Sequence, residues 1–132
     1  MRSAWLAHQF TQGSDDMKDT QDYFDNWIVQ VRKGVLEYCI LNTLYMQERY
    51  GYDIVKTLVG LPGLGVTEGT IYPLLSRLRV QKLVTTRLEE SSEGPVRKYY
   101  ALTTKGKDTV ESMEEHLTRL VQQSRQLRNL GD

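Results

Sequence analysis

The spacing of apolar residues changes abruptly after Gln81, from the period of a helix to the period of a strand. Upstream, four apolar residues recur three and four positions apart, as on one buried helix face. They are Ile71, Leu74, Leu75 and Leu78. Downstream, Val84, Thr86 and Leu88 alternate, as in a strand with one buried side. We therefore expect a helix, with Thr67 as its N-cap, to run almost directly into a strand.

The segment after this helix has the pattern of a β-hairpin. Two strand-like stretches, Leu83–Leu88 and Val96–Leu102, flank Glu89–Pro95, which carries the turn-forming pairs Ser-Ser and Gly-Pro. Thr103 can then cap a last helix whose apolar residues follow the three-four alternation of a coiled coil.

Two more helices are expected upstream. Amphipathic spacing begins at Tyr23 and continues to about Met46, with a break or kink expected at Gly34. Tyr52–Val59 repeats the pattern, and Gly60–Gly65 forms a glycine-rich turn. The glycines of this turn do not read as a phosphate loop, because no strand precedes them and no lysine follows in register.

The order helix, helix, helix, hairpin, long helix predicts a mainly α fold with a small β-hairpin, namely a winged helix-turn-helix plus a long C-terminal helix. We expect residues 1–20 to be a disordered leader or an added segment. Residues 21–107 would form the winged helix-turn-helix with an N-terminal helical extension, and residues 108–132 a dimerisation helix.

Composition restricts the function. Charged residues make up 26% of the 132 residues and no apolar run reaches the ~18 needed to span a bilayer, so we expect a cytoplasmic protein without membrane contact. One cysteine, Cys39, and two histidines, His8 and His116, cannot form a Cys/His zinc cluster. Neither a cofactor, a metal nor a catalytic dyad is expected, and Cys39 reads as a core thiol. Enzymatic activity is therefore not predicted.

Charge is unevenly distributed although the formal net charge is zero. Residues 27–107 hold twelve basic and seven acidic residues, net +5, whereas residues 1–26 are net −3 and residues 108–132 net −2. Because the local charge matters more than the sum, the middle of the chain keeps a basic surface suited to nucleic acid.

The face of the third helix opposite its apolar stripe is unusual. At about 100° per residue, Gly69, Pro73 and Ser76 lie at its centre and Tyr72 and Arg77 at its sides. A solvated face usually carries Glu and Lys, whereas small residues let a helix approach DNA closely. The DNA contacts expected on this helix are Thr67, Gly69, Thr70, Tyr72, Pro73, Ser76, Arg77 and Arg79. Pro73 should kink the helix or mark its real start. The alternative is a helix-turn-helix that binds only protein.

Arg97 and Lys98 are adjacent in the second strand of the hairpin and so point to opposite faces, which lets one of them meet a phosphate. The alternative for this strand is a solvated edge protected by charge. Glu89, Glu90 and Glu93 near the tip oppose insertion into a DNA groove.

Three sequence motifs resemble the PadR family of bacterial transcriptional regulators. They are Tyr50-Gly51-Tyr52-Asp53-Ile54, Gly69-Thr70-Ile71-Tyr72-Pro73-Leu74-Leu75 with Leu78, and Arg97-Lys98-Tyr99-Tyr100-Ala101-Leu102-Thr103 with Gly106. The length is similar to the short form of the family, with one C-terminal helix. This resemblance implies a homodimer that binds an inverted-repeat operator in double-stranded DNA and is released by an effector, for which a small aromatic or phenolic molecule is considered.

The chain departs from the family pattern at three places. Lys82 stands where the family commonly has glycine, so a left-handed helix terminus is not expected there. Gly94-Pro95-Val96 lacks an arginine often found before the Arg-Lys pair, which predicts fewer phosphate contacts. Leu117 occupies the position of a tryptophan that stacks on planar ligands in some relatives, so such stacking is not predicted.

The last helix carries a narrow apolar stripe that favours dimerisation over packing on its own domain. The stripe residues are Val110, Met113, Leu117, Leu120 and Leu127. Tyr23, Phe24 and Trp27 form an aromatic cluster that we interpret as a core patch against the last helix, with the wall of an effector pocket as the alternative. The leading hypothesis is a dimeric repressor, and the runner-up is a winged-helix protein-interaction module without DNA binding.

Overall fold

A computed structural model describes residues 14–131 of the chain. Most of the segment expected to be a leader, residues 1–13, lies outside this range. The first helix, α2 (Ser14–Thr43), begins earlier than the predicted Tyr23, so the expectation of disorder up to residue 20 is wrong for residues 14–20. Asp15 and Asp16 lie in its first turn, where carboxylates stabilise a helix N-terminus. The helix also continues through Gly34 without a break.

The chain forms two compact units that divide within α2, between Val35 and Leu36. The first unit contains the N-terminal part of α2. The second contains the end of α2 and every later element. No helix within residues 14–131 combines the length and the hydropathy that crossing a bilayer requires.

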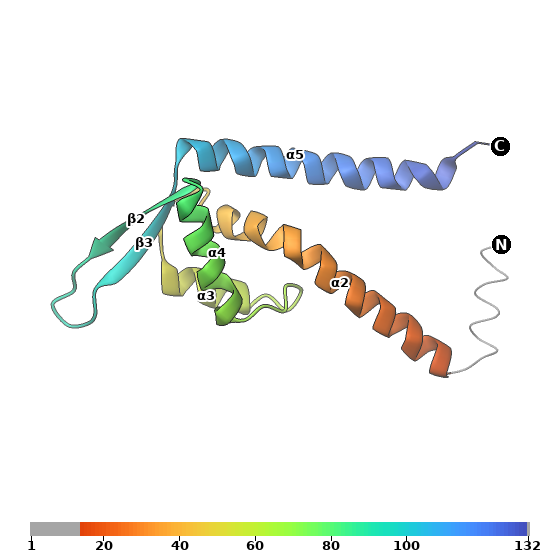
Figure 1. Cartoon of the computed structure of the whole chain (residues 1–132), viewed down its shortest axis with the longest axis horizontal. Helices are drawn as coiled ribbons and strands as arrows, with labels where there is room; N and C mark the ends of the chain where they lie inside the picture. The colour runs from red at the N-terminus through yellow and green to blue at the C-terminus, as the bar shows by residue number, and fades with distance from the viewer. Residues whose placement is uncertain (1–13, 132) are drawn as a thin grey trace. The chain divides into compact units, whose positions relative to one another are not determined.

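The second unit has the predicted order of elements. Helices α3 (Gly51–Val59) and α4 (Glu68–Val80) precede strands β2 (Val84–Glu89) and β3 (Arg97–Leu102), and helix α5 (Thr104–Gln126) follows and ends in the short helix η1 (Leu127–Asn129) (Figure 1). The predicted mainly α fold with a small hairpin is confirmed. We call β2, β3 and the loop between them the wing.

A strand that the sequence did not reveal completes the sheet. Strand β1 (Arg49–Tyr50) precedes α3 and pairs antiparallel with β3, so the strand order is β1-β3-β2. In this register Tyr50 lies opposite Tyr99, and Arg87 of β2 lies opposite Tyr99 on its other side. The three side chains therefore share one face of the sheet.

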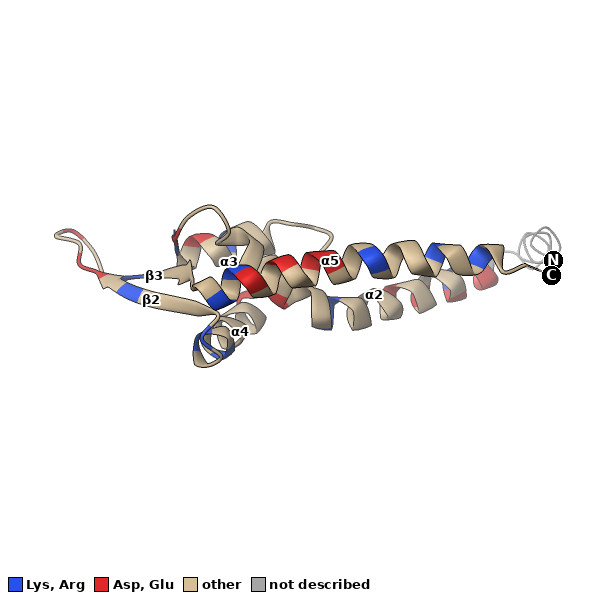
Figure 2. Ribbon diagram, turned by 90° about the horizontal axis from the view of Figure 1, so that it is seen from above, with Lys and Arg blue, Asp and Glu red and all other residues tan. Residues whose placement is uncertain are grey.

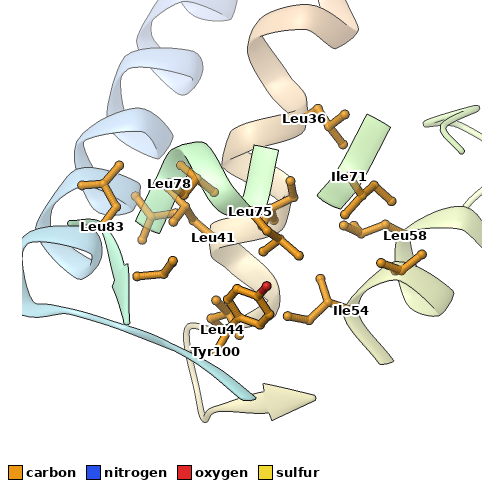
Figure 3. Packing of buried hydrophobic residues seen from close by; sticks show 14 residues of the cluster. Leu36, Leu41, Leu44, Ile54, Leu58, Ile71, Leu75, Leu78, Leu83 and Tyr100 are labelled. Carbon is orange, nitrogen blue, oxygen red and sulfur yellow. The ribbon is translucent and has the colours of Figure 1, made fainter. Parts of the chain in front are cut away.

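One hydrophobic core joins the end of α2, helices α3, α4 and α5, and the wing (Figure 3). Helix α2 contributes Leu36, Ile40 and Leu41, the turn after it contributes Leu44, and α3 contributes Ile54, Val55 and Leu58. The stripe predicted on α4 is confirmed, since Ile71, Leu75 and Leu78 are buried and Leu74 packs against the core. Val84, Tyr100 and Val110 extend the core into the wing and α5.

The end of α4 corrects the expectation for Lys82, which has a φ of 64° and is left-handed. The Leu83 amide donates to the Leu78 carbonyl (3.0 Å) and the Lys82 amide to the Arg79 carbonyl (2.9 Å). These two bonds define a Schellman motif, in which the left-handed residue is normally glycine. Because Leu78 and Leu83 are both buried, packing holds Lys82 in a conformation that costs an L-residue about 1–2 kcal/mol.

Hydrogen bonds join the start of α5 to the residues just before β2. Thr103 is the N-cap as predicted, and its hydroxyl accepts from the Gly106 amide (3.0 Å) and donates to the Lys82 carbonyl (2.7 Å). The Thr103 amide donates to the Leu83 carbonyl (3.1 Å). A Cβ on Gly106 would lie only 1.9 Å from that carbonyl oxygen, so only glycine permits this approach.

Candidate nucleic-acid interface

The outer face of α4 is exposed, as its apolar stripe requires. Gly69, Pro73 and Ser76 are exposed, and Tyr72 is 43% exposed beside them. Gly69, Pro73 and Ser76 carry no long side chain that would hold another surface away from this face. This surface can approach the floor of a major groove or the phosphates closely.

Pro73 lies inside α4, which begins at Glu68, so Pro73 does not mark the start of the helix. Proline has no N–H group and therefore cannot donate to the carbonyl of Gly69, four residues earlier. Gly69 is itself exposed on the outer side of the helix.

The N-terminus of α4 exposes two hydroxyl groups. Thr67 is the N-cap residue as predicted, but its side chain makes no capping hydrogen bond to the helix. Its Oγ1 lies 3.5 Å from the Oγ1 of Thr70, and both residues are exposed. Both hydroxyls are thus able to donate to a phosphate close to the positive end of the helix dipole.

Tyr72 joins α4 to a group of tyrosines around the wing. Burial raises the pKa of Tyr72, and the Glu68 carboxylate and the neighbouring Tyr50 and Tyr52 raise it further. Burial also raises the pKa of Tyr100. Tyr72 raises this pKa further, whereas Arg79 lowers it. Tyr72 therefore keeps its proton at neutral pH and remains a hydrogen-bond donor, as a phosphate contact requires.

The two arginines of α4 differ in their surroundings. Arg77 makes an ion pair with Glu37 of α2, with 3.2 Å between Nη1 and Oε1, although its side chain stays 67% exposed. Arg79 is exposed and lies close enough to Tyr100 to influence its pKa. Figure 2 shows basic residues on α4 and on both strands of the wing, and acidic residues at the wing tip.

Arg97 and Lys98 point to opposite faces of β3, as predicted. The Arg97 guanidinium lies 5.0 Å from the centre of the Tyr50 ring, whereas the Lys98 ammonium lies 5.9 Å from that of Tyr100. Tyr50 faces outward with Tyr99, and Tyr100 faces the core.

The outer face of the sheet carries a row that sequence reasoning missed. The Arg87 guanidinium carbon lies 4.5 Å from the centre of the Tyr99 ring, and the centres of the Tyr99 and Tyr50 rings are 5.9 Å apart. The Arg97 guanidinium lies over the Tyr50 ring. We call Arg87, Tyr99, Tyr50 and Arg97 the outer row. The motifs around Tyr50 and Tyr99 were visible in the sequence, but only the register of β1 brings them together.

The residues expected to form a dimer have two different environments. Val110 is 1% exposed in the core of its own unit and Met113 packs against that core, so these two fulfil the alternative prediction of packing on their own domain. Leu117 is half-buried, while Leu120 and Leu127 are 49% and 63% exposed.

The aromatic cluster in the first unit does not belong to the hydrophobic core. Tyr23, Phe24 and Trp27 are all at least half exposed, and the Phe24 and Trp27 rings stack with centroids 6.2 Å apart. The three side chains line a shallow hollow together with Asp19 and Thr20. These side chains are therefore exposed within the first unit, and their interpretation as a core patch against the last helix stays a prediction.

Cys39 is half-buried against the core, and burial raises the pKa of its thiol. It behaves as the core thiol that the sequence predicts, since a raised pKa lowers the thiolate fraction. Within residues 14–131, no group of three or more His, Cys, Asp or Glu side chains is arranged to hold a metal.

Three helices followed by a two-stranded wing define the winged helix-turn-helix class, and α4 holds the position of the second helix of that motif, the recognition helix of the class. Residues 40–112 match the family model described as the transcriptional regulator PadR-like family. The chain therefore belongs to the PadR-like family of transcriptional regulators, which is not a family of enzymes.

Known proteins are similar over much of the chain. A PadR-like transcription factor from Bacteroides fragilis is 40% identical, with a TM-score of 0.66 over 77% of this chain and 98% of that one. Bacillus subtilis PadR, solved with operator DNA, is 31% identical, with a TM-score of 0.53 over 60% of this chain and 46% of that one. The Escherichia coli transcriptional regulator YqjI is 34% identical over 86 residues, which are 64% of this chain and 40% of YqjI.

Proposed function

We propose that this regulator is a homodimeric repressor in which α4 of each protomer enters the major groove of an inverted-repeat operator. The observation that carries the proposal is the exposed outer face of α4, with Gly69, Pro73 and Ser76 at its centre. The similarity to Bacillus subtilis PadR in its complex with operator DNA supports the same assignment. In a symmetric dimer, the two α4 helices would bind half-sites about 34 Å apart.

The proposed DNA contacts are divided between α4 and the wing. Thr67, Thr70 and Tyr72 supply hydroxyl donors, and Arg79 supplies a charge near the end of the helix. Arg97 and Lys98 hold phosphates from the wing, and Arg77 reaches DNA only by sharing its guanidinium with Glu37. Because Glu89, Glu90 and Glu93 surround the wing tip, the wing steadies the complex rather than reading bases.

The assignment of α4 is tested by adding a charge to its outer face. Ser76→Glu is expected to weaken binding by about tenfold or more, because the carboxylate would face the phosphates. Gln122→Glu adds the same charge to an exposed position of α5 and is expected to leave binding unchanged. A mobility shift with DNA from upstream of the protein's own gene, at stated salt, measures both.

Tyr72→Ala complements this test by deletion. It is expected to abolish operator binding while the dimer persists, because it removes the hydroxyl donor and the ring from the exposed side of α4. Unchanged affinity for both Ser76→Glu and Tyr72→Ala would remove α4 from the interface. Failure of the wild-type protein to bind any duplex would instead favour a protein-interaction module.

The dimer is proposed to form through the exposed part of the α5 stripe. Leu120 of α5 and Leu127, the first residue of η1, are both exposed, and a second copy would cover them. Leu120→Lys should therefore shift the sedimentation coefficient to that of a monomer, whereas Gln122→Lys, on the opposite side of α5, should not. A dimer that survives Leu120→Lys would place the interface elsewhere.

The effector is proposed to be a small aromatic or phenolic molecule bound at the cluster of Tyr23, Phe24 and Trp27. The stacked Phe24 and Trp27 rings and the exposed Tyr23 provide faces on which a planar ligand can pack. Titration of phenol into the protein–DNA complex should release DNA, while cyclohexanol, a non-aromatic control, should not. A Trp27→Ala variant that responds to phenol like the wild type would contradict this site.

A further inference from the structure

The two arginines of the outer row have different electrostatic partners. Arg87 donates from Nε and Nη2 to both carboxylate oxygens of Glu48, with distances of 2.5–3.1 Å, and its Nη2 lies 3.8 Å from Glu89. Among residues 14–131, no carboxylate lies within 4.0 Å of Arg97. The charge of Arg87 is therefore neutralised within the protein, while that of Arg97 is not.

The contact between Arg87 and Glu48 uses the edge of the guanidinium that a phosphate would also use. Nε and Nη2 form the fork that binds a carboxylate or a phosphate through two parallel hydrogen bonds. Glu48 occupies this fork, and the hydrogen bond from Arg87 lowers the pKa of Glu48, so the carboxylate stays ionised at neutral pH. The guanidinium carbon in addition lies 4.5 Å from the centre of the Tyr99 ring.

The same pair connects two parts of the DNA-binding unit that are distant in sequence. Glu48 directly precedes β1, which leads into α3, whereas Arg87 lies on β2 at the opposite edge of the sheet. The contact therefore spans β3 and passes beside Tyr99. It ties the outer strand of the wing to the segment that enters the helix-turn-helix.

We propose that Arg87 and Glu48 are positioning residues that fix the wing against the helix-turn-helix, and that Arg97 alone of the outer row contacts phosphate. This inference rests on the proposed DNA binding. Arg97 projects from β3 over Tyr50, the residue before α3, so its place depends on how the wing lies against that ring. Loss of the Arg87–Glu48 contact frees the wing and misplaces Arg97.

The proposal predicts a pattern of affinities that charge alone does not produce. Arg87→Ala, Arg87→Lys and Glu48→Gln should each weaken binding by a similar factor, about three- to tenfold. Lysine does not rescue, because it keeps the charge but lacks the two-pronged geometry. Glu89→Gln is the matched control, since it removes a negative charge near Arg87 without breaking a hydrogen bond, and it should leave binding unchanged or tighten it.

Salt dependence separates positioning from phosphate contact. Arg97→Ala should lower the slope of log affinity against log salt by about 0.9 per protomer, the value for one lost phosphate contact. Arg87→Lys should leave the slope equal to that of the wild type. Affinities are measured by fluorescence anisotropy below the melting temperature of each variant, on the duplex that the wild-type protein enriches from a random-sequence library.

The outcomes distinguish this inference from the proposed function. If the wild-type protein enriches no sequence, DNA binding itself fails. If it does enrich a sequence, three results would each overturn the positioning role. The first is tighter or unchanged binding by Glu48→Gln, and the second is wild-type affinity of Arg87→Lys. The third is a salt slope of Arg87→Ala that is lowered as in Arg97→Ala. Equal losses for Arg87→Lys and Glu48→Gln that are not additive in the double variant would support it.

Discussion

Replacing Gly106 by alanine should strongly destabilise the fold, because the added methyl group would collide with backbone. An ideal Cβ at this position lies 1.9 Å from the Leu83 oxygen and 2.9 Å from the Leu83 carbonyl carbon. Ordinary carbon–oxygen contacts begin at about 3.3 Å, so the start of α5 would have to move away from β2 by more than 1 Å, roughly.

The cost of this movement follows from the bonds that it breaks. Two hydrogen bonds join Thr103 to the carbonyls of Lys82 and Leu83, and a third joins the Gly106 amide to the Thr103 hydroxyl. At about 1 kcal/mol each they contribute about 3 kcal/mol, and forced packing adds about 1–3 kcal/mol. The better helix propensity of alanine returns about 1 kcal/mol. We therefore expect Gly106→Ala to lower the free energy of unfolding by about 3–5 kcal/mol.

Gly34→Ala is the matched control for this prediction. Gly34 lies within α2 and a Cβ there would meet no atom within 4 Å, so the substitution should stabilise the protein by about 0.5–1 kcal/mol. Urea unfolding followed by far-UV circular dichroism, at one protein concentration, measures both variants. A loss under about 1 kcal/mol for Gly106→Ala, or shifts of the same sign for both variants, would refute the reasoning.

Three further predictions concern a backbone strain and two titrations. Lys82→Gly should raise the free energy of unfolding by up to about 1 kcal/mol in urea unfolding, because glycine removes the strain of φ 64°, and a loss of stability would contradict the left-handed assignment. Burial raises the pKa of Cys39, so alkylation by iodoacetamide should be slower in the folded protein than in urea. For the same reason, stability should fall as pH rises through the pKa of the unfolded thiol. Equal alkylation rates would argue against burial. Arg87 lowers the pKa of Glu48, so the stability that this pair contributes is present above the pKa of the unfolded carboxyl and is lost as pH falls through the folded pKa. An NMR titration should show a higher Glu48 pKa in Arg87→Ala than in the wild type. An unchanged Glu48 pKa would show that the pair is not formed.

The helical parts of the site could be predicted because they follow from local periodicity. The spacing of Ile71, Leu75 and Leu78 defines the buried side of α4, and the opposite side then follows from helix geometry. Thr103 and Thr67 were recognised as N-caps for the same reason, since capping depends on residues close in sequence.

The parts that could not be predicted depend on contacts between distant segments. Strand β1 has only two residues and no periodicity of its own, and its pairing with β3 alone brings Tyr50 to Tyr99. The Glu48–Arg87 pair likewise requires the register of three strands. Lys82 adopts its left-handed conformation because the burial of Leu78 and Leu83 outweighs local preference.

Directed cleavage of DNA from α4 tests the central claim most directly. An iron chelate attached at Ser76→Cys, in a Cys39→Ser background, should cut a bound operator at two centres about 10–10.5 base pairs apart, because one α4 helix would lie in each successive major groove. The same chelate attached at Gln122→Cys on α5 should cut at neither centre. Cleavage from the α5 position with none from the α4 position would contradict the assignment of α4 as the DNA-reading helix.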